Sequence, residues 1–254
     1  MPIFDNWLSK LQERPKGISL MYKLLPSKLK SKIYKTYMWY KFLYYNFSAL
    51  VGRSKVSYSD FNEDLIVESI FEGQTGSYID VGAGHPVIGS NTFKFYKKGW
   101  DGITVEPIRL HNILHRLKRR RDLQINRLLS ESKNKVKLYE FNPTQYSTNS
   151  ESQYKSMVST GMKERRTYYL KSISINEVLS MVKSKAYFLT IDCEGYDYEI
   201  IRMINWNQIN KPRAIVFEII SNSIEAKEIH QLLNAQSYTL TNKTQINNIY
   251  TLAK

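Results

Sequence analysis

Residues 77–107 read SYIDVGAGHPVIGSNTFKFYKKGWDGITVEP, and this stretch decides the fold. Residues 77–84 are an apolar run that ends in closely spaced glycines, which predicts a β-strand leading into a tight turn. Residues 91–99 indicate a short helix that stops at a glycine, and residues 102–107 indicate a second strand that closes at a proline. A strand, a turn, a helix and another strand in this order predict a βαβ unit with parallel strands.

Helix-like and strand-like segments continue to alternate on both sides of this unit. Before it, a helix is expected at 61–73, with Asp60 as its cap and Glu63 at the capping-box position. After it, the pattern predicts helices at 108–119, 174–182 and 223–234, and strands at 122–130, 135–141, 186–192, 213–220, 237–244 and 246–254. The alternation predicts an α/β fold with a doubly wound, mostly parallel sheet, to which the C-terminal hairpin adds an antiparallel strand. The polar segment 142–172 is expected to be a mobile lid or active-site segment.

The composition limits the class of protein. The chain has 254 residues, a formal net charge of +14 and one cysteine, Cys193, so an intrachain disulfide is impossible and a reducing, cytoplasmic setting is expected. No run approaches the roughly 20 apolar residues of a transmembrane helix, and the N-terminus lacks the apolar core of a signal peptide. The positive charge favours an anionic partner, which could be nucleic acid, phospholipid or a phosphate-bearing substrate.

Residues 1–59 are expected to form a basic, aromatic, helical extension, followed by one domain at 60–254. No acidic residue occurs between Glu13 and Asp60, and residues 31–50 contain eight aromatic side chains with lysines between them. Aromatic rings and long cationic side chains suit a membrane interface. Three readings of residues 31–50 stay open: packing on the domain, peripheral membrane contact and base stacking on nucleic acid.

Ligands of doubly wound sheets bind at the carboxyl ends of the strands, which directs attention to the glycine turn. The spacing of Gly82, Gly84 and Gly89 differs from the dinucleotide pattern, and Asp80 precedes the first glycine by two residues. A carboxylate at that place suits the ammonium and sulfonium charges of S-adenosylmethionine. Glu106 ends the next strand, where an acid can accept hydrogen bonds from both ribose hydroxyls. Ser130, at the end of the third expected strand, is placed near the adenine.

A second stretch, LTIDCEGYDYE (189–199), holds four acidic residues. Asp192 and Glu194 are expected to share one face at the end of a strand, whereas Asp197 and Glu199 match the dipole at the start of a helix. If the sulfonium methyl group is transferred to a hydroxyl, that hydroxyl needs a base to accept its proton or a metal to lower its pKa. The candidates are Asp192 or Glu194 as general base, His85 as a competing base, and a Mg²⁺ site of Asp192, Glu194 and Glu218; substrate binding alone is the remaining reading.

The order of these motifs resembles that of the FkbM-type S-adenosylmethionine-dependent methyltransferases, over roughly residues 60–220. The matching features are the Asp-x-Gly-Ala turn and, after it, Ser90-Asn91-Thr92, Gly99-Trp100, Glu106-Pro107, Arg121-Asp122 and Asp192-x-Glu194-Gly195. The resemblance implies a Rossmann-like methyltransferase fold, a cofactor site and O-methylation, often of a saccharide or natural product. The cofactor-binding residues it implies are Asp80, Gly82, Ala83, Gly84, Asn91, Glu106, Pro107 and Ser130.

The expected activity is therefore methylation of a saccharide or glycan precursor, with a lipid-linked acceptor if residues 31–50 bring the enzyme to the inner face of a membrane. An RNA methyltransferase and a non-catalytic, membrane-associated module that keeps the fold are the alternatives, and nucleic acid is the less favoured partner. Whether the chain forms a homo-oligomer is left open.

Overall fold

The computed structural model describes residues 56–132, 134–142, 144–184, 186–218 and 224–253, which belong to one compact unit. The extension expected at 1–59, with its aromatic stretch at 31–50, lies almost wholly outside these residues and stays a prediction. In the described ranges, no helix combines the length and the apolar character that crossing a membrane requires.

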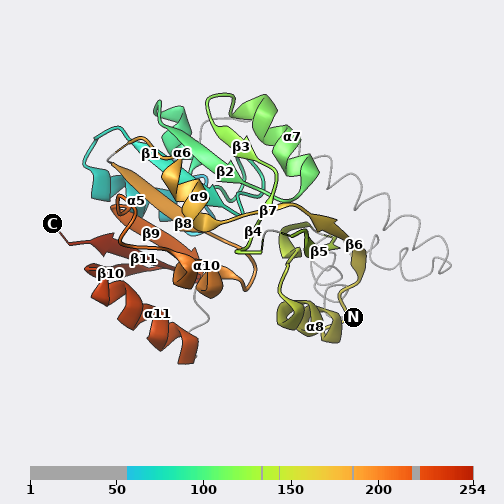
Figure 1. The fold of residues 1–254 in the computed structure, drawn as a ribbon. Coiled ribbons are helices and arrows are strands. Elements are labelled where there is room, and N and C mark those ends of the chain that lie inside the picture. The colour runs from blue at the N-terminus through green and yellow to red at the C-terminus, as the bar shows by residue number, and fades with distance from the viewer. Residues whose placement is uncertain (1–55, 133, 143, 185, 219–223, 254) are drawn as a thin grey trace, which may run out of the picture. The chain divides into compact units, whose positions relative to one another are not determined.

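Seven strands form the main sheet in the order β10-β11-β9-β8-β1-β2-β3 (Figure 1). Their bounds are β1 Ser77–Val81, β2 Asp101–Val105, β3 Leu123–Ile125, β8 Tyr187–Ile191, β9 Ala214–Glu218, β10 Tyr238–Lys243 and β11 Asn247–Leu252. Within this sheet, the neighbouring strands β3, β2, β1, β8 and β9 pair in parallel. Strand β11 is antiparallel to both β9 and β10. The doubly wound sheet and its antiparallel C-terminal hairpin are thus confirmed. The chain leaves by β3 and returns at β8, so the strand order reverses between β1 and β8.

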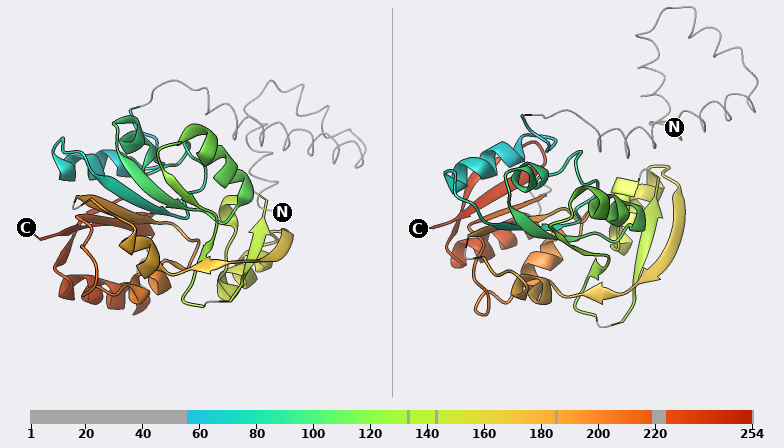
Figure 2. Two further views of the ribbon diagram at one scale, coloured as in Figure 1. Left: turned by 45° about the horizontal axis from the view of Figure 1, so that its top comes forward. Right: turned by 90° about the horizontal axis from the view of Figure 1, so that it is seen from above.

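Helices cover both faces of this sheet (Figure 2). One face carries α5 Glu63–Phe71, α6 Phe93–Lys97 and α7 Arg109–Lys118, and the other carries α9 Ile175–Ser180, α10 Asp197–Met203 and α11 Ile224–Ala235. Successive residues of a strand point to opposite faces. Phe188 therefore packs with α5 and α6, while Leu189 belongs to the larger core under α9, α10 and α11. Because β8 is buried on both faces at every residue, it reads as a continuous apolar run.

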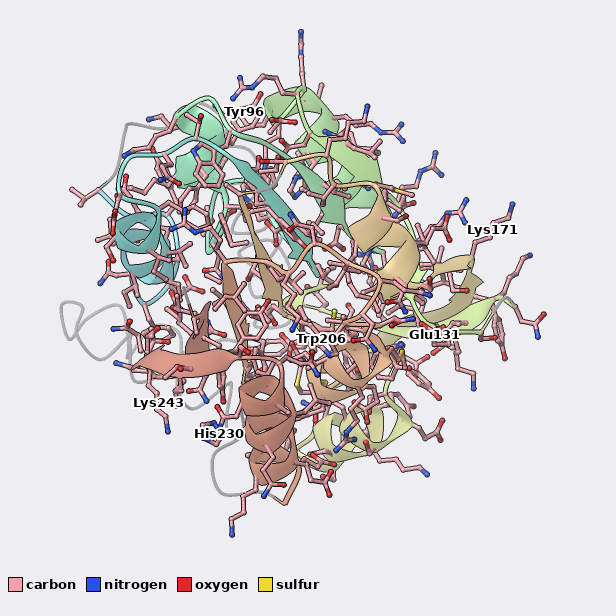
Figure 3. The ribbon with its side chains drawn as sticks, turned by 60° about the vertical axis from the view of Figure 1, so that its left-hand side comes forward. Tyr96, Glu131, Lys171, Trp206, His230 and Lys243 are labelled. Carbon is pink, nitrogen blue, oxygen red and sulfur yellow. The ribbon has the colours of Figure 1, made fainter. Side chains whose placement is uncertain are left out.

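A smaller unit stands at one end of the main sheet, and we call residues 134–170, without residue 143, the accessory unit. Its elements are β5 Val136–Phe141, η2 Thr144–Tyr146, α8 Glu151–Ser159 and β6 Glu164–Leu170, and β5 pairs with β6 in antiparallel orientation. Beside it, β4 Leu128–Leu129 pairs with β7 Ser172–Ile173. Figure 3 labels Lys171 at this end of the protein and Lys243, on β10, at the other. The segment expected to be a lid is therefore built into regular elements.

The accessory unit is ordered because each face of its hairpin buries apolar side chains. Tyr139 and Phe141 pack on Met157 of α8, and the stacked rings of Tyr139 and Tyr154 lie 4.0 Å apart between centroids. On the other face, Leu138 joins a cluster with Ile108 and Leu128 of the main domain. The sequence prediction missed this packing because it depends on the pairing of β5 with β6, across α8.

Two local predictions were wrong in detail. The N-cap of α5 is Asn62, in the left-handed region and without a side-chain cap, and not Asp60; Glu63 instead accepts a hydrogen bond from the Phe61 amide at 2.9 Å. The third strand ends at Ile125, since the Asn126 side chain turns back to donate to the carbonyls of Glu106 and Pro107. Ser174 is the N-cap of α9, where its Oγ accepts from the Glu177 amide at 3.1 Å.

Candidate active site

The glycine turn after β1 touches the end of β8, at the point where the strand order reverses. Gly82 has φ +72°, and a Cβ at this residue would lie 1.8 Å from the carbonyl oxygen of Asp192. The Asp192 amide donates to the Val81 carbonyl at 2.9 Å, so the two strand ends are joined by backbone. Only glycine fits here, both for its conformation and for its lack of a side chain. This edge of the sheet is where doubly wound folds bind ligands.

Glu106 holds the other side of the turn. Its carboxylate is buried and accepts hydrogen bonds from the amides of Gly84 at 2.7 Å and Ile108 at 2.6 Å. The Nδ1 atom of His111, on α7, lies 3.7 Å from the same carboxylate. Each carboxylate oxygen keeps a second acceptor site, so the predicted contact with ribose hydroxyls is compatible with this arrangement.

Asp80 lies beneath the turn, within a buried polar network. It accepts a hydrogen bond from Thr92 Oγ1, and Arg119 lies 3.8 Å from its carboxylate. Burial raises the pKa of Asp80 to about 6, although the Arg119 guanidinium opposes the rise. In this structure Asp80 therefore supports the turn from below and adds negative charge there; direct contact with a cofactor ammonium stays a prediction.

Arg119 is the main residue that the sequence analysis missed. It is fully buried and donates to Asp122 at 2.7 Å and to Thr92 at 2.8 Å, and Asp122 also accepts from the Tyr78 hydroxyl at 2.7 Å. A signal was present, because His111, His115 and Arg119 recur every four residues and so share the inner face of α7.

Two histidines organise the backbone of the turn. His85 is buried, and its Nδ1 atom accepts from the amides of Val87 and Ile88, both at 3.1 Å. A neutral ring that accepts at Nδ1 carries its proton on Nε2, so this geometry favours a structural role for His85 over that of a base. The Nε2 atom of His115 lies 3.2 Å from the carbonyl oxygen of Gly84, and burial, with Arg119 nearby, lowers the pKa of His115 far below its usual range.

The acidic stretch after β8 adopts a turn, which corrects the expectation that Asp192 and Glu194 share a strand face. The strand ends at Ile191, and Glu194 and Gly195 have φ values of +48° and +88°. Asp197 opens α10 and is buried; its carboxylate accepts from the Cys193 amide at 3.2 Å. Asp197 thus closes the turn, and Glu199 lies in the first turn of the helix, as expected.

The carboxyls of this turn perturb one another. Burial raises the pKa of Glu194 to about 8, with a further contribution from Glu218 and Asp197, and burial raises that of Asp197 to about 7. The pKa of Asp192 lies well above its usual range, first because protein surrounds the carboxyl and second because of the neighbouring acids. Solvent nevertheless reaches the Asp192 side chain.

We call Asp192, Glu194, Asp197 and Glu218 the acid cluster. Glu218 ends β9, beside β8 in the sheet, and burial raises its pKa also. Burial and, for Asp192, Glu194 and Asp197, the neighbouring acids both favour the protonated carboxyls, so a cation bound here would favour their ionised forms. Among the described residues, no group of three or more His, Cys, Asp or Glu is arranged to hold a metal ion. The predicted Mg²⁺ site is thus unsupported.

The accessory unit contacts the turn after β8 and also helix α7. Thr148 Oγ1 donates to the carbonyl oxygen of Glu194 at 3.0 Å, and the Gln153 side chain lies 3.4 Å from where a Cβ of Gly195 would be. On the cofactor side, Thr144 Oγ1 lies 3.2 Å from Nε2 of His111.

The remaining predicted cofactor residues lie at different distances from this centre. Asn91 donates to Thr190 Oγ1 of β8 at 3.1 Å, next to the turn. Ala83 is buried and its amide is 3.3 Å from the Val105 carbonyl. Ser130 follows β4 instead of a strand of the main sheet, and its side chain hydrogen-bonds to Tyr196. Its place beside the adenine stays a prediction.

The chain was then compared with known proteins. A family model described as the methyltransferase FkbM domain matches residues 80–240. No curated protein gives a significant match. Among solved structures, monomeric WbdD is 10% identical with a TM-score of 0.41, and the match covers 75% of this chain but 40% of WbdD. A TehB-like SAM-dependent methyltransferase from Corynebacterium glutamicum is 8% identical with a TM-score of 0.39, covering 86% and 100% of the two chains.

Proposed function

Because the chain belongs to the FkbM methyltransferase family and is an S-adenosylmethionine-dependent methyltransferase, we propose that it methylates a hydroxyl group of a saccharide or glycan precursor. The observation that supports O-methylation is the acid cluster, which lies between the glycine turn and the accessory unit. A carboxylate there is placed to remove the proton of a weakly acidic hydroxyl. The proposed setting is the cytoplasm, with an acceptor from polysaccharide biosynthesis.

We assign the cofactor to the glycine turn that follows β1 and lies beside the end of β8. The proposed contacts are Asp80, Gly82, Ala83, Gly84, Asn91, Glu106, Pro107 and Ser130. The fit rests on two features of this structure. The backbone at Gly84 has open space where a side chain would be, and no cation of the described residues offsets the raised pKa values of Asp192 and Glu194. A ligand that carries an ammonium and a sulfonium supplies such charge.

When bound, the cofactor provides an electrophilic methyl group and leaves as a neutral thioether. The chain holds the acceptor oxygen in line and takes its proton as the new O–C bond forms. We assign the proton to Glu194, whose pKa of about 8 makes it a stronger base than an ordinary carboxylate once it is ionised. Asp192, which solvent reaches, is assigned the return of that proton to water.

Label transfer tests the reaction. Protein supplied with methyl-labelled S-adenosylmethionine should label a glycan or glycolipid fraction of the source cells. Glu194→Gln and Asp192→Asn should lower turnover by roughly 10²-fold, while cofactor binding persists in calorimetry. Glu199→Gln is the matched control, since Glu199 lies in the same helical turn as Asp197 but does not contribute to the raised pKa of Glu194. Full turnover in both test variants would remove the base assignment.

Three alternatives have distinct signatures. An RNA methyltransferase would transfer label to tRNA and lose RNA affinity steeply with added salt. A non-catalytic module would fail to bind S-adenosylmethionine in calorimetry. Metal assistance by Asp192, Glu194 and Glu218 would make activity sensitive to exhaustive chelation and recoverable with Mg²⁺. We expect cofactor binding, glycan labelling and activity that survives chelation.

A further inference from the structure

The helix that follows β2 presents two different faces. The inner face of α7 carries His111 and His115, which are buried against the cofactor side of the sheet. The outer face is a single stripe at helical spacing, made of Arg109, Ile113, Arg116, Leu117 and Arg120, all exposed. We call these five residues the α7 stripe. Arg120 lies just beyond the last helical residue, Lys118.

The apolar members of the stripe are unusual for this surface. Ile113 is 45% exposed and Leu117 is 56% exposed, one helical turn apart. The other large exposed hydrophobic side chains of the described ranges, for example Val158 on α8 and Tyr169 on β6, lie singly. Scattered apolar residues need no explanation, whereas a pair on one exposed helical face points to a partner.

The charged members of the stripe lack compensating acids. Residues 107–121 contain no Asp or Glu. Within the ranges that the structure covers, Arg109, Arg116 and Arg120 take part in no ion pair, whereas Arg119 of the inner face is paired with Asp122. Three arginines beside two aliphatic side chains form a surface that is complementary to anionic groups bordering an apolar phase.

We propose that the α7 stripe binds the surface of an anionic lipid membrane. Arginine side chains bind headgroup phosphates, and Ile113 and Leu117 enter the boundary with the acyl chains. Nucleic acid fits less well, since the stripe offers no aromatic ring on which a base could stack. Residues 1–55 of the chain are also an unfavourable partner for the stripe. They contain 11 Lys and Arg against two acids, so they would repel its arginines.

Docking of the α7 stripe on a membrane would fix the distance between the active site and the lipid headgroups. On the inner face of α7, His115 contacts Gly84 and His111 lies by Glu106. The glycine turn would then lie about one helix diameter, roughly 10 Å, from the headgroups. A lipid-linked acceptor could reach it without leaving the membrane, although binding of the stripe does not depend on the identity of the acceptor.

Cosedimentation of the full chain with vesicles tests the proposal. Wild-type protein should bind vesicles of phosphatidylcholine mixed with phosphatidylglycerol, and bind phosphatidylcholine alone much more weakly. Replacing Arg109, Arg116 and Arg120 together by Gln should weaken binding to the anionic vesicles by roughly a hundredfold, given about fivefold for each cation near the surface.

The double variant Ile113→Gln and Leu117→Gln should weaken the same binding by about tenfold or more, because the apolar contribution is lost. Val158→Gln is the matched control, an exposed aliphatic residue on α8 that should leave binding unchanged. Calorimetry with S-adenosylmethionine verifies that each variant is folded. Wild-type affinity in the triple arginine variant or in the double variant would overturn the proposal, even if residues 1–55 bind membranes by themselves. Preferential binding to RNA over the vesicles would overturn it as well.

Discussion

The pH dependence of catalysis is set by Glu194 if this residue is the base. Its pKa is raised to about 8 by burial and by Glu218 and Asp197. At pH 7 roughly a tenth of such a group is ionised, and at pH 9 about nine-tenths. A base must be ionised to accept a proton. We therefore expect kcat/KM for the cofactor to rise about tenfold between pH 7 and pH 9 and then to level off.

The choice of kinetic constant matters, because kcat/KM for S-adenosylmethionine reports the ionisation of the free enzyme, whereas kcat reports the complex. A bound sulfonium favours the ionised carboxylate. The rise in kcat should therefore occur at a lower pH than the rise in kcat/KM. The assay is transfer of labelled methyl groups to the acceptor fraction, with initial rates measured from pH 6 to pH 9.5.

Two variants decide the assignment. Glu194→Gln should lose roughly 10²-fold in rate and lose the rise with pH, while Glu199→Gln should keep the wild-type profile. The acid cluster titrates as a coupled group, so the apparent pKa belongs to the cluster and not to one residue. A wild-type profile that is flat from pH 6 to pH 9, or an unchanged rise in Glu194→Gln, would refute the reasoning.

Three further predictions concern the framework of the site. Gly82→Ala should abolish cofactor binding in calorimetry or prevent folding, because its Cβ would lie 1.8 Å from the Asp192 carbonyl oxygen; wild-type affinity would contradict the assigned close approach. Arg119→Met should cost about 3–5 kcal/mol of unfolding free energy in urea denaturation, because it leaves Asp122 buried without its partner, whereas Arg120→Met, at an exposed position, should cost about 0.5 kcal/mol or less. Thr148→Val should raise the KM for the acceptor several-fold and leave cofactor affinity unchanged, because the tether to the Glu194 carbonyl is lost; equal effects on both substrates would argue against an acceptor role for the accessory unit.

The main sheet could be predicted because its central strands are buried on both faces. Residues 186–191 are apolar except for Thr190, and the structure buries β8 throughout. The glycines after β1 and the acid after β2 could likewise be placed at one edge, because parallel strands bring their carboxyl ends together. These inferences need only local pattern and the direction of the strands.

Features that depend on non-local contacts could not be predicted in this way. The departure of residues 128–129 from the main sheet follows from their pairing with β7, more than 40 residues later in the chain. Arg119 is one of several consecutive cations in the sequence at the end of α7, yet its side chain is turned inward to Asp122 and Thr92. The sequence shows that Arg119 follows His115 by four residues, which places both on one helical face. It does not show whether that face points toward the sheet.

The turn after β8, which carries most of the acid cluster, lowers the stability of the fold at neutral pH, so its features are better explained by function. Glu194 occupies the left-handed region, which is costly for a residue other than glycine. The carboxyls of Asp197 and Glu194 have pKa values of about 7 and 8 in the fold, against about 4 in an unfolded chain. Their contribution to stability is therefore greatest below about pH 4 and declines as the pH rises through the folded values. A fold selected for stability alone would not gather them. A cationic cofactor reverses the balance, since it favours the ionised carboxylates, and part of its binding free energy is the relief of their repulsion.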